Sequence, residues 1–551
     1  MKIFILLILF LGSISTFTFT QTNIPAGNVS GTWILAKSPY YINGEITIPD
    51  DSTLTIEQGV EVVFTGHYKL NVQGRLLAIG TKTDSIRFTA DDKNAGWHGI
   101  RFINTPNTNK ISKLEYCSFK YGKANTGALN SLDRCGGAIM INRFDSVLVS
   151  HCLFDSNMAS GDKGTTGGAG ICIFYGSPTI SENTFSNNDG SQSSAGALVV
   201  DFTSKALIKN NIFYNNKSEY GTIICAFGND NQPIISGNII SYNAANTCAG
   251  GIFVYSSSNP SIENNIIIHN QASFGAGVMI YESGKAKLIN NTIAYNHATS
   301  GGGLYCEKYD DPILINNILW GNSAVSGKQV YLNHSQADPV FFNCDIEGGM
   351  EGFSGVGAGF EYNGLFKNNI DEDPLFAKYE ADDFSLSNIS WCIGVGIDSI
   401  EIEGTMYHCP LFCIKGNLRP SPAGTKPDIG ACENPLGTFV NVEEKIKTPI
   451  NFMLYQNYPN PFNPTTAISY QLSAFSHVIL KIYDILGREV STLVNEEKPV
   501  GIYEVTWNAV DLTSGVYFYQ LKAVPQNGRH SSDYPDRSGH DIETKKMVLL
   551  R

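Results

Sequence analysis

The 551-residue chain has no long apolar run beyond its first residues, few charged side chains and no cluster of Lys or Arg. Charged residues make up 16% of the chain, and the formal net charge is −13. Nucleic acids and anionic membrane surfaces attract basic patches, so this balance argues against both as partners. Because no later stretch approaches a spanning length, we expect no transmembrane segment in the mature chain.

The one marked apolar run lies at the amino terminus, where Ile3 to Leu11 follow Lys2. Small and hydroxyl residues come next, and the run is too short to cross a bilayer. This pattern is typical of a secretory signal peptide, which we assign to residues 1–20. The protein is therefore expected outside the cytoplasm.

Apolar residues at helical spacing are also lacking, which argues against a helical repeat. The chain instead repeats a phrase of two Asn residues, two apolar or β-branched residues and, after two more positions, another Asn. The second Asn recurs every 26 or 27 residues, at Asn211, Asn238, Asn265, Asn291 and Asn317. A fixed period of this size indicates a solenoid, whose repeats stack and cannot bury their apolar faces alone.

The register extends further if Cys can stand for Asn. Nine coils then lie between residues 117 and 344, with aligned positions Cys117, Cys152, Asn183, Asn211, Asn238, Asn265, Asn291, Asn317 and Cys344. A second row of short apolar runs keeps step with the first. Strands that stack at about 4.8 Å favour a parallel β-helix, which we place at residues 104–350. Stacked amides satisfy one another, so we interpret the ladder as structural.

Residues 21–103 lack the Asn ladder but contain short alternating strands such as Ile46-Thr47-Ile48. We predict that they form capping coils, because a solenoid must cover its terminal edges. The segments Gly74–Thr81, Ile86–Thr89 and Trp97–Ile100 resemble the opening coils of secreted bacterial right-handed β-helix proteins. This resemblance implies a right-handed solenoid.

A Cys-rich segment, residues 351–435, follows the regular coils. Its four cysteines, Cys392, Cys409, Cys413 and Cys432, could form two disulfides in three connectivities, and zinc is the alternative. The runs at 373–376, 391–394 and 427–433 resemble the closing segment of β-helix surface proteins, often called a choice-of-anchor domain. Trp391 and Cys432 replace the usual Pro and Tyr of that pattern, and the comparison implies a disulfide between Cys392 and Cys432.

The last hundred residues, 452–551, follow a linker at 436–451 and differ in style. Their alternating runs predict a small antiparallel β-sandwich of about seven strands. Four motifs, Tyr-Pro-Asn-Pro-Phe-Asn-Pro, Asp-x-Leu-Gly-Arg, Ser-Gly-Val-Tyr-Phe-Tyr and Lys-Lys-Met-Val-Leu-Leu-Arg, resemble the type A C-terminal sorting domain of the type IX secretion system. Their marker residues are Asn460, Pro461, Phe462, Gly487, Arg488, Gly515, Lys545 and Lys546.

The resemblance implies that the secretion machinery of a Gram-negative-type bacterium is a partner. The protein would pass through the periplasm, cross the outer membrane, and then be released or attached to the cell surface. The overall prediction is an all-β protein, a right-handed parallel β-helix followed by a small antiparallel β-sandwich.

Parallel β-helices of the pectate-lyase-like class include polysaccharide lyases and glycoside hydrolases, but a fold does not establish a reaction. The chain has no Gly-His-Gly motif, and its Asp pairs at 91–92, 310–311 and 382–383 lie in turn-like contexts. No acidic column suited to Ca²⁺ runs along the ladders, although Asp371-Glu372-Asp373 could bind that ion. We therefore nominate no catalytic residue, metal site or cofactor; Ca²⁺ is expected only for a lyase.

One row of side chains could bind a ligand. By alternation, Phe253, Tyr255, Tyr281 and Tyr305 lie on the outward face of their strands, with Asp201 and Glu307 at the edges. Stacked aromatics beside carboxylates suit a glycan, whereas an apolar strip can also be covered by a partner or a loop.

The leading hypothesis is a non-catalytic secreted or cell-surface protein that binds or organises extracellular polysaccharide. The alternatives are a polysaccharide lyase or glycoside hydrolase with an unrecognised site, and an adhesin-like spacer that binds no ligand.

Overall fold

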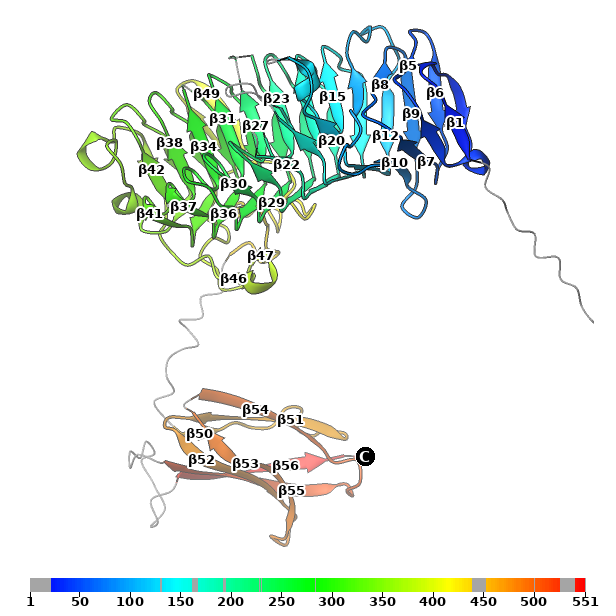
Figure 1. Ribbon diagram of the computed structural model, residues 1–551. Helices are drawn as coiled ribbons and strands as arrows, with labels where there is room; N and C mark the ends of the chain where they lie inside the picture. Colours follow the sequence, from blue (N-terminus) through cyan, green and yellow to red (C-terminus); the bar gives the residue numbers. More distant parts are fainter. Residues whose placement is uncertain are drawn as a thin grey trace, which may run out of the picture. The chain divides into compact units, whose positions relative to one another are not determined.

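The computed structural model describes residues 21–128, 131–160, 167–191, 195–226, 228, 230–282, 284–438, 452–499, 501–525 and 541–550. The predicted signal peptide and most of the predicted linker, residues 439–451, lie outside this part. The chain divides into two compact units, residues 1–440 and 441–551 (Figure 1). Each unit is described by itself.

The first unit is a right-handed parallel β-solenoid, which confirms the predicted fold class (Figure 1). Each coil contributes one strand to each of three parallel sheets, and successive coils pair laterally. Sheet A contains β1 (Thr22–Ile24), β4 (Tyr40–Ile42), β7 (Glu61–Phe64), β10 (Ile86–Ala90), β13 (Cys117–Lys120), β17 (Leu153–Asp155), β21 (Thr184–Ser186), β25 (Ile212–Tyr214), β29 (Ile239–Ser241), β33 (Ile266–Ile268), β36 (Thr292–Ala294), β40 (Ile318–Trp320) and β44 (Asp345–Ile346).

The other two large sheets have the same order along the solenoid. Sheet B contains β2 (Gly27–Asn28), β5 (Ile46–Ile48), β8 (Leu70–Val72), β11 (Ile100–Phe102), β15 (Ile139–Asn142), β19 (Ile171–Phe174), β23 (Leu198–Asp201), β27 (Ile223–Ala226), β31 (Ile252–Tyr255), β34 (Val278–Tyr281), β38 (Leu304–Cys306) and β42 (Val330–Leu332). Sheet C contains β3 (Gly31–Trp33), β6 (Thr53–Ile56), β9 (Arg75–Ile79), β12 (Ser112–Glu115), β16 (Val147–Ser150), β20 (Thr179–Ser181), β24 (Leu207–Lys209), β28 (Ile234–Ser236), β32 (Ser261–Glu263), β35 (Lys287–Ile289), β39 (Ile313–Ile315), β43 (Val340–Phe342) and β45 (Phe366–Lys367).

A fourth, narrower row of strands follows sheet A in the chain. It contains β14 (Lys123–Ala124), β18 (Met158–Ala159), β22 (Asp189–Gly190), β26 (Lys217–Ser218) and β30 (Ala244–Ala245), with β37 (His297–Ser300) and β41 (Ser323–Ser326) as a separate pair. The turns that follow these strands lead the chain into sheet B.

One continuous apolar core fills the lumen of the solenoid. Side chains of a strand alternate in direction, so every second residue points inward and meets its equivalent in the next coil. In sheet A this places five phenylalanines in one stack, with successive ring centroids 4.6–5.0 Å apart. The stack consists of Phe88, Phe119, Phe154, Phe185 and Phe213.

Asparagines form the predicted ladder at the turn into sheet A. From Asn183 to Asn291, each Nδ2 donates to the Oδ1 of the next ladder Asn at 2.9–3.0 Å. The backbone N–H of each of these residues donates to that same Oδ1. Each Nδ2 also donates to a backbone carbonyl, as Asn211 does to Ile180 at 3.0 Å. At the ends, the N–H of Cys117 donates to the Cys152 sulfur at 3.3 Å and that of Asn317 to the Cys344 sulfur at 3.4 Å.

The last Asn of the repeated phrase forms a second ladder that we did not predict. These residues are equally buried, and their Nδ2–Oδ1 distances are 2.9–3.0 Å. The second ladder consists of Asn157, Asn188, Asn216, Asn243, Asn270, Asn296 and Asn322. The first Asn of the phrase has a different role, because Asn264 and Asn316 adopt φ values of 53° and 55°. Asn tolerates this left-handed conformation better than most residues.

The segment after the last full coils folds back onto the outside of the solenoid. It includes the hairpins β46 (Phe376–Lys378)–β47 (Asp383–Leu386) and β48 (Ser399–Ile402)–β49 (Thr405–His408). Arg419 and Glu433 form a fully buried ion pair at 2.9 Å, and Arg419 also donates to Asn264 of the solenoid at 2.8 Å. These contacts fix residues 419–433 beside the turn that leads into sheet A.

The structure does not join Cys392 and Cys432 by the disulfide that the comparison implied. The two residues belong to different apolar clusters. The Cys392 thiol instead donates to Oδ2 of Asp345 at 3.0 Å. A carboxylate of the last coil therefore takes the place of the expected sulfur partner.

The second unit is a seven-stranded antiparallel sandwich with its own core. One sheet contains β50 (Met453–Leu454), β51 (Thr465–Leu472) and β54 (Gly501–Asn508), and the other contains β52 (Ser476–Tyr483), β53 (Glu489–Lys498), β55 (Gly515–Pro525) and β56 (Asp541–Leu549). The opening motif contacts the last strand, because Oδ1 of Asn460 accepts from the Val548 N–H at 2.9 Å. Phe462 is buried. Gly487, with φ of 76°, makes the turn in which Arg488 pairs with Asp484 at 2.7 Å.

Candidate functional site

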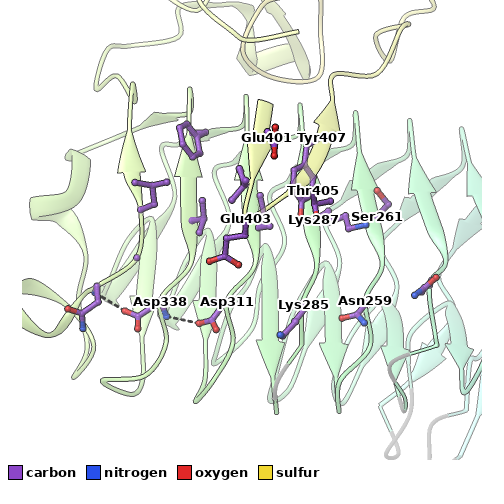
Figure 2. Close-up of a pocket in the computed structure, with 18 of the residues that line it drawn as sticks. Asn259, Ser261, Lys285, Lys287, Asp311, Asp338, Glu401, Glu403, Thr405 and Tyr407 are labelled. Atoms are coloured by element: carbon purple, nitrogen blue, oxygen red, sulfur yellow. Dashed lines mark hydrogen bonds between the residues drawn. The ribbon is translucent and has the colours of Figure 1, made fainter. Parts of the chain in front are cut away.

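A groove of about 960 Å³ runs over the outer face of sheet C (Figure 2). Its floor is formed by the outward residues of strands β28, β32, β35, β39 and β43 and by the turns that precede them. The hairpin β48–β49 forms the opposite wall. Because the floor strands belong to successive coils, the groove follows the solenoid axis.

Each coil places one polar turn residue in the groove. The strand register aligns these positions, which lie two residues before the first outward strand residue. Along the axis they are Gln232, Asn259, Lys285, Asp311, Asp338 and Asn363. Figure 2 shows Asn259, Lys285, Asp311 and Asp338 in one row. Adjacent positions are separated by about 4.8 Å, the spacing of neighbouring strands.

Backbone contacts fix the two aspartates of this row. Oδ1 of Asp311 accepts from the Asp338 N–H at 3.0 Å, and Oδ1 of Asp338 accepts from the Asn363 N–H at 2.7 Å. Each carboxylate thus connects its coil to the next one and keeps its second oxygen for another partner. The row is preorganised by the same stacking that builds the solenoid.

The hairpin wall is anchored by Ile402. This residue is buried against Ile289, Ile315 and Phe342 of the sheet. The tight turn at Glu403-Gly404 has positive φ at both positions, as a two-residue hairpin turn requires.

Polar hairpin residues face the floor of the groove. The Lys287 Nζ lies 5.9 Å from the centre of the Tyr407 ring. Glu401, Glu403 and Thr405 complete this wall (Figure 2). The groove therefore combines one aromatic face with donors and acceptors of both charge signs.

Asp311 has the most perturbed carboxyl in the groove. Partial burial by the groove walls raises its pKa although the residue is exposed overall, and the carboxylates of Asp338 and Glu403 add to this effect. The hydrogen bond from the Asp338 N–H and the charge of Lys285 oppose the rise without cancelling it. The direction of this shift favours the protonated form of Asp311 relative to an ordinary Asp. No group of three or more His, Cys, Asp or Glu side chains is placed to hold a metal ion within the described ranges.

The aromatic strip predicted as exposed is largely covered. Phe253 and Tyr305 are 8% and 5% exposed, and Asp201 is buried. Glycine-rich turns lie directly on this row, since a Cβ on Gly275 would come within 2.7 Å of Met279 and 3.0 Å of Tyr305. The predicted exposure is therefore wrong for these three residues, because alternation shows which side a residue faces but not what covers it.

The remaining members of the strip also have partners. Tyr255 and Tyr281 are half-buried, with ring centroids 5.8 Å apart. Both oxygens of Glu307 accept from the Nδ2 of Asn333, at 2.8 and 2.9 Å. The structure thus places the four predicted aromatic residues in a second apolar cluster outside the lumen.

The residues of the groove were missed in the sequence, with Asp311 considered only as a turn residue. Its neighbour Asp310 is buried and accepts from the Gly284 N–H at 2.9 Å, which is structural. A usable signal was the recurrence of polar residues two positions before the strands of sheet C that form the groove floor. The hairpin wall has no such signal, because residues 399–408 lie far from the floor in the chain.

Two family models match the chain. A right-handed β-helix region matches residues 137–317 and 245–376, and a secretion system C-terminal sorting domain matches residues 456–529. The protein is a right-handed β-helix protein with a type IX sorting domain. Comparison with curated proteins gives no match. This β-helix protein is thus directed to the cell surface or the extracellular space, and the secretion machinery is a partner.

No helix in the described part of this β-helix protein is long and apolar enough to cross a membrane. The sorting domain supplies the route of export, and the solenoid carries the candidate binding surface.

Proposed function

We propose that this β-helix protein binds a linear extracellular polysaccharide in the groove over sheet C. The observation that carries the proposal is the row of aligned polar side chains, one per coil, along the groove. A linear polymer laid along the solenoid axis meets a new donor or acceptor at each step of about 4.8 Å. A compact ligand would use only part of this row.

The chemistry of the lining suits sugars. Amide, hydroxyl and carboxylate groups can bind sugar hydroxyls, and Tyr407 offers an aromatic surface to the apolar face of a pyranose ring. The groove crosses successive coils, so a polymer can lie along it. Export to the cell surface places the groove where such polymers occur.

Retention on a polysaccharide panel tests this proposal. We expect the full exported chain to be retarded in native gels that contain one class of polysaccharide. Tyr407→Ala should raise the apparent Kd obtained from this retardation at least tenfold. The matched control is Tyr309→Ala, since Tyr309 is exposed and lies outside the groove. Like Tyr407, it has a lysine over its ring, with the Lys308 Nζ 4.6 Å from the ring centre. Equal losses in both variants, or no retardation by any polymer, would contradict the proposal.

A second candidate is hydrolysis of the bound polymer. Asp311, with its raised pKa, lies in the same groove as the carboxylates Asp338 and Glu403. Glycoside hydrolysis uses two carboxyl groups, one of them a general acid with a raised pKa. New reducing ends that appear with the wild type and not with Asp311→Asn, while both retain the polymer, would establish this activity.

A further inference from the structure

Two cysteines lie together outside the lumen, at the start of the regular coils. Cys135 and Cys172 belong to the apolar cluster on the outer face of sheet B, and both are buried. Their thiols form a side-chain hydrogen bond with each other.

The fold brings the two residues together from different coils. Cys135 follows the short 3-10 helix η2 (Leu132–Arg134), in the loop before β15. Cys172 lies in β19, one coil further along, and pairs in register with Met140. A bond between the two sulfurs would tie this loop to the next coil.

Arg101 binds the loop that contains Cys135 and places a positive charge beside it. Its Nη1 donates to the carbonyl of Cys135 at 2.9 Å, and its side chain is completely buried. Its Nε and Nη2 have no hydrogen-bond partner among the described residues. The hydrogen bond from Cys172 lowers the pKa of Cys135, and the guanidinium lowers it further against the effect of burial. A thiol in this position is the more reactive member of a pair.

A second pair of neighbouring cysteines, Cys117 and Cys152, has a structural role in the first ladder. Cys117 and Cys152 lie inside the lumen as members of the Asn ladder. Each donates to a backbone carbonyl, Cys117 to Ala78 at 3.4 Å and Cys152 to Leu114 at 3.3 Å. They replace ladder asparagines and already satisfy the groups that those asparagines would bind.

We propose that Cys135 and Cys172 form a disulfide when the protein is exported. The inference depends on the export route and not on glycan binding. The Cys135 thiolate attacks the disulfide of a periplasmic dithiol oxidase and releases one of its thiolates. The Cys172 thiolate then attacks this mixed disulfide, so the Cys135–Cys172 bond forms and the oxidase leaves with both its cysteines reduced. Two protons and two electrons pass from the protein to the oxidase.

Peptide mapping of the exported full-length protein tests the pairing. The protein is denatured in iodoacetamide without reductant and digested with trypsin. We expect residues 135–143 linked to residues 164–205, whereas the peptides 114–120 and 144–163, which contain Cys117 and Cys152, are recovered alkylated. Alkylated Cys135 and Cys172, or a link from Cys135 to another cysteine, would overturn the proposal.

Thermal unfolding gives an independent readout. A reducing agent should lower the Tm of the wild type by several degrees and leave the Tm of a Cys135→Ser, Cys172→Ala double variant unchanged, because a disulfide stabilises by restricting the unfolded chain. Cys225→Ala, which removes a solitary buried thiol, should keep the full response to the reductant. A wild-type Tm that does not respond would contradict the bond.

Discussion

Buried asparagine side chains connect successive coils through bonds that an apolar residue cannot make. Asn265 is a central example, since it accepts from Asn238 at 2.9 Å and donates to Asn291 at 3.0 Å. Its Oδ1 also satisfies the backbone N–H of Asn238. Removal of this side chain takes the shared acceptor away from two buried donors, the Nδ2 and the backbone N–H of Asn238, and the donor away from the carbonyl of Ile235.

We expect Asn265→Ala to lower the free energy of unfolding of the solenoid by about 3 kcal/mol, because each buried unsatisfied donor costs about 1–3 kcal/mol. Denaturant unfolding of the full chain measures this change. The control is Asn246→Ala, an exposed Asn bound to Glu219, which should cost less than about 0.5 kcal/mol. Similar losses in the two variants would show that the ladder does not carry the stability assigned to it.

Asp345 gives the attachment of the closing segment a dependence on pH. Burial raises its pKa to about 7, above the ordinary value of about 3.9 that we expect in the unfolded chain. At a pH between these two pKa values, Asp345 is protonated in the folded state and ionised in the unfolded state. Stability must fall as the pH rises from about 4 to about 7, and the full penalty applies above that range.

Asp345→Asn should remove this part of the decline. We expect the difference in Tm between pH 5 and pH 8 to be smaller in the variant than in the wild type, without vanishing, because burial also raises the pKa of Asp428 to about 7. Thermal scans at the two pH values provide the measurement. An unchanged difference would mean that Asp345 is ionised in the folded protein.

The hairpin β48–β49 is the element that turns a flat sheet face into a groove. Among the hairpin residues that line the groove, Ile402 is the one that is buried against the sheet. We expect Ile402→Ala to weaken its docking by about 2–4 kcal/mol, the usual cost of such a truncation. Amide hydrogen exchange at residues 399–408 should then speed up while the coils keep their protection.

The exposed residue Met406 supplies the control for this prediction. Met406→Ala should leave exchange in the hairpin close to that of the wild type. Faster exchange throughout the solenoid of the Ile402 variant would show instead that the hairpin supports the coils themselves.

The coils were predictable from the sequence because stacking demands the same residue at the same place in every turn. The Asn and Cys positions of the first ladder follow from their period, and so does the parallel arrangement of strands. The second ladder was present in the same phrase and was overlooked because its Asn stands apart from the apolar run.

The sites were harder to predict because they depend on what lies over a strand. Phe253 and Tyr305 face outward as alternation requires, yet turns from their own and neighbouring coils cover them. The groove could not be foreseen for the opposite reason, since its wall comes from the hairpin at 399–408. A contact between segments that are far apart in the chain produces no repeat in the sequence of either segment, so the sequence pattern does not predict it.

At the scale of the whole molecule, the proposed binding groove and the sorting domain belong to separate units. Each unit has its own hydrophobic core, so we expect a chain ending at residue 438 to keep the solenoid intact. In a bacterium with a type IX system, this truncated chain should remain in the periplasm, whereas the full chain reaches the surface or the medium. Cell fractionation with an antibody against the solenoid distinguishes the two locations.

Circular dichroism of the purified truncated chain is the necessary control. Its spectrum and Tm should show a folded β-protein, so that retention in the periplasm reflects the missing sorting domain. Export of the truncated chain at the wild-type level would contradict the role of the last unit.

The most direct test of polymer binding along the solenoid is the dependence of affinity on ligand length. The retained polysaccharide is cut into oligosaccharides of increasing size, and each is titrated calorimetrically against the full chain and Tyr407→Ala. For the wild type, the Kd should fall with each added sugar until the ligand spans the groove, about 24 Å for five steps of about 4.8 Å, and then stay constant. A Kd that does not change beyond one or two sugars, or that is the same in Tyr407→Ala, would contradict binding along the groove.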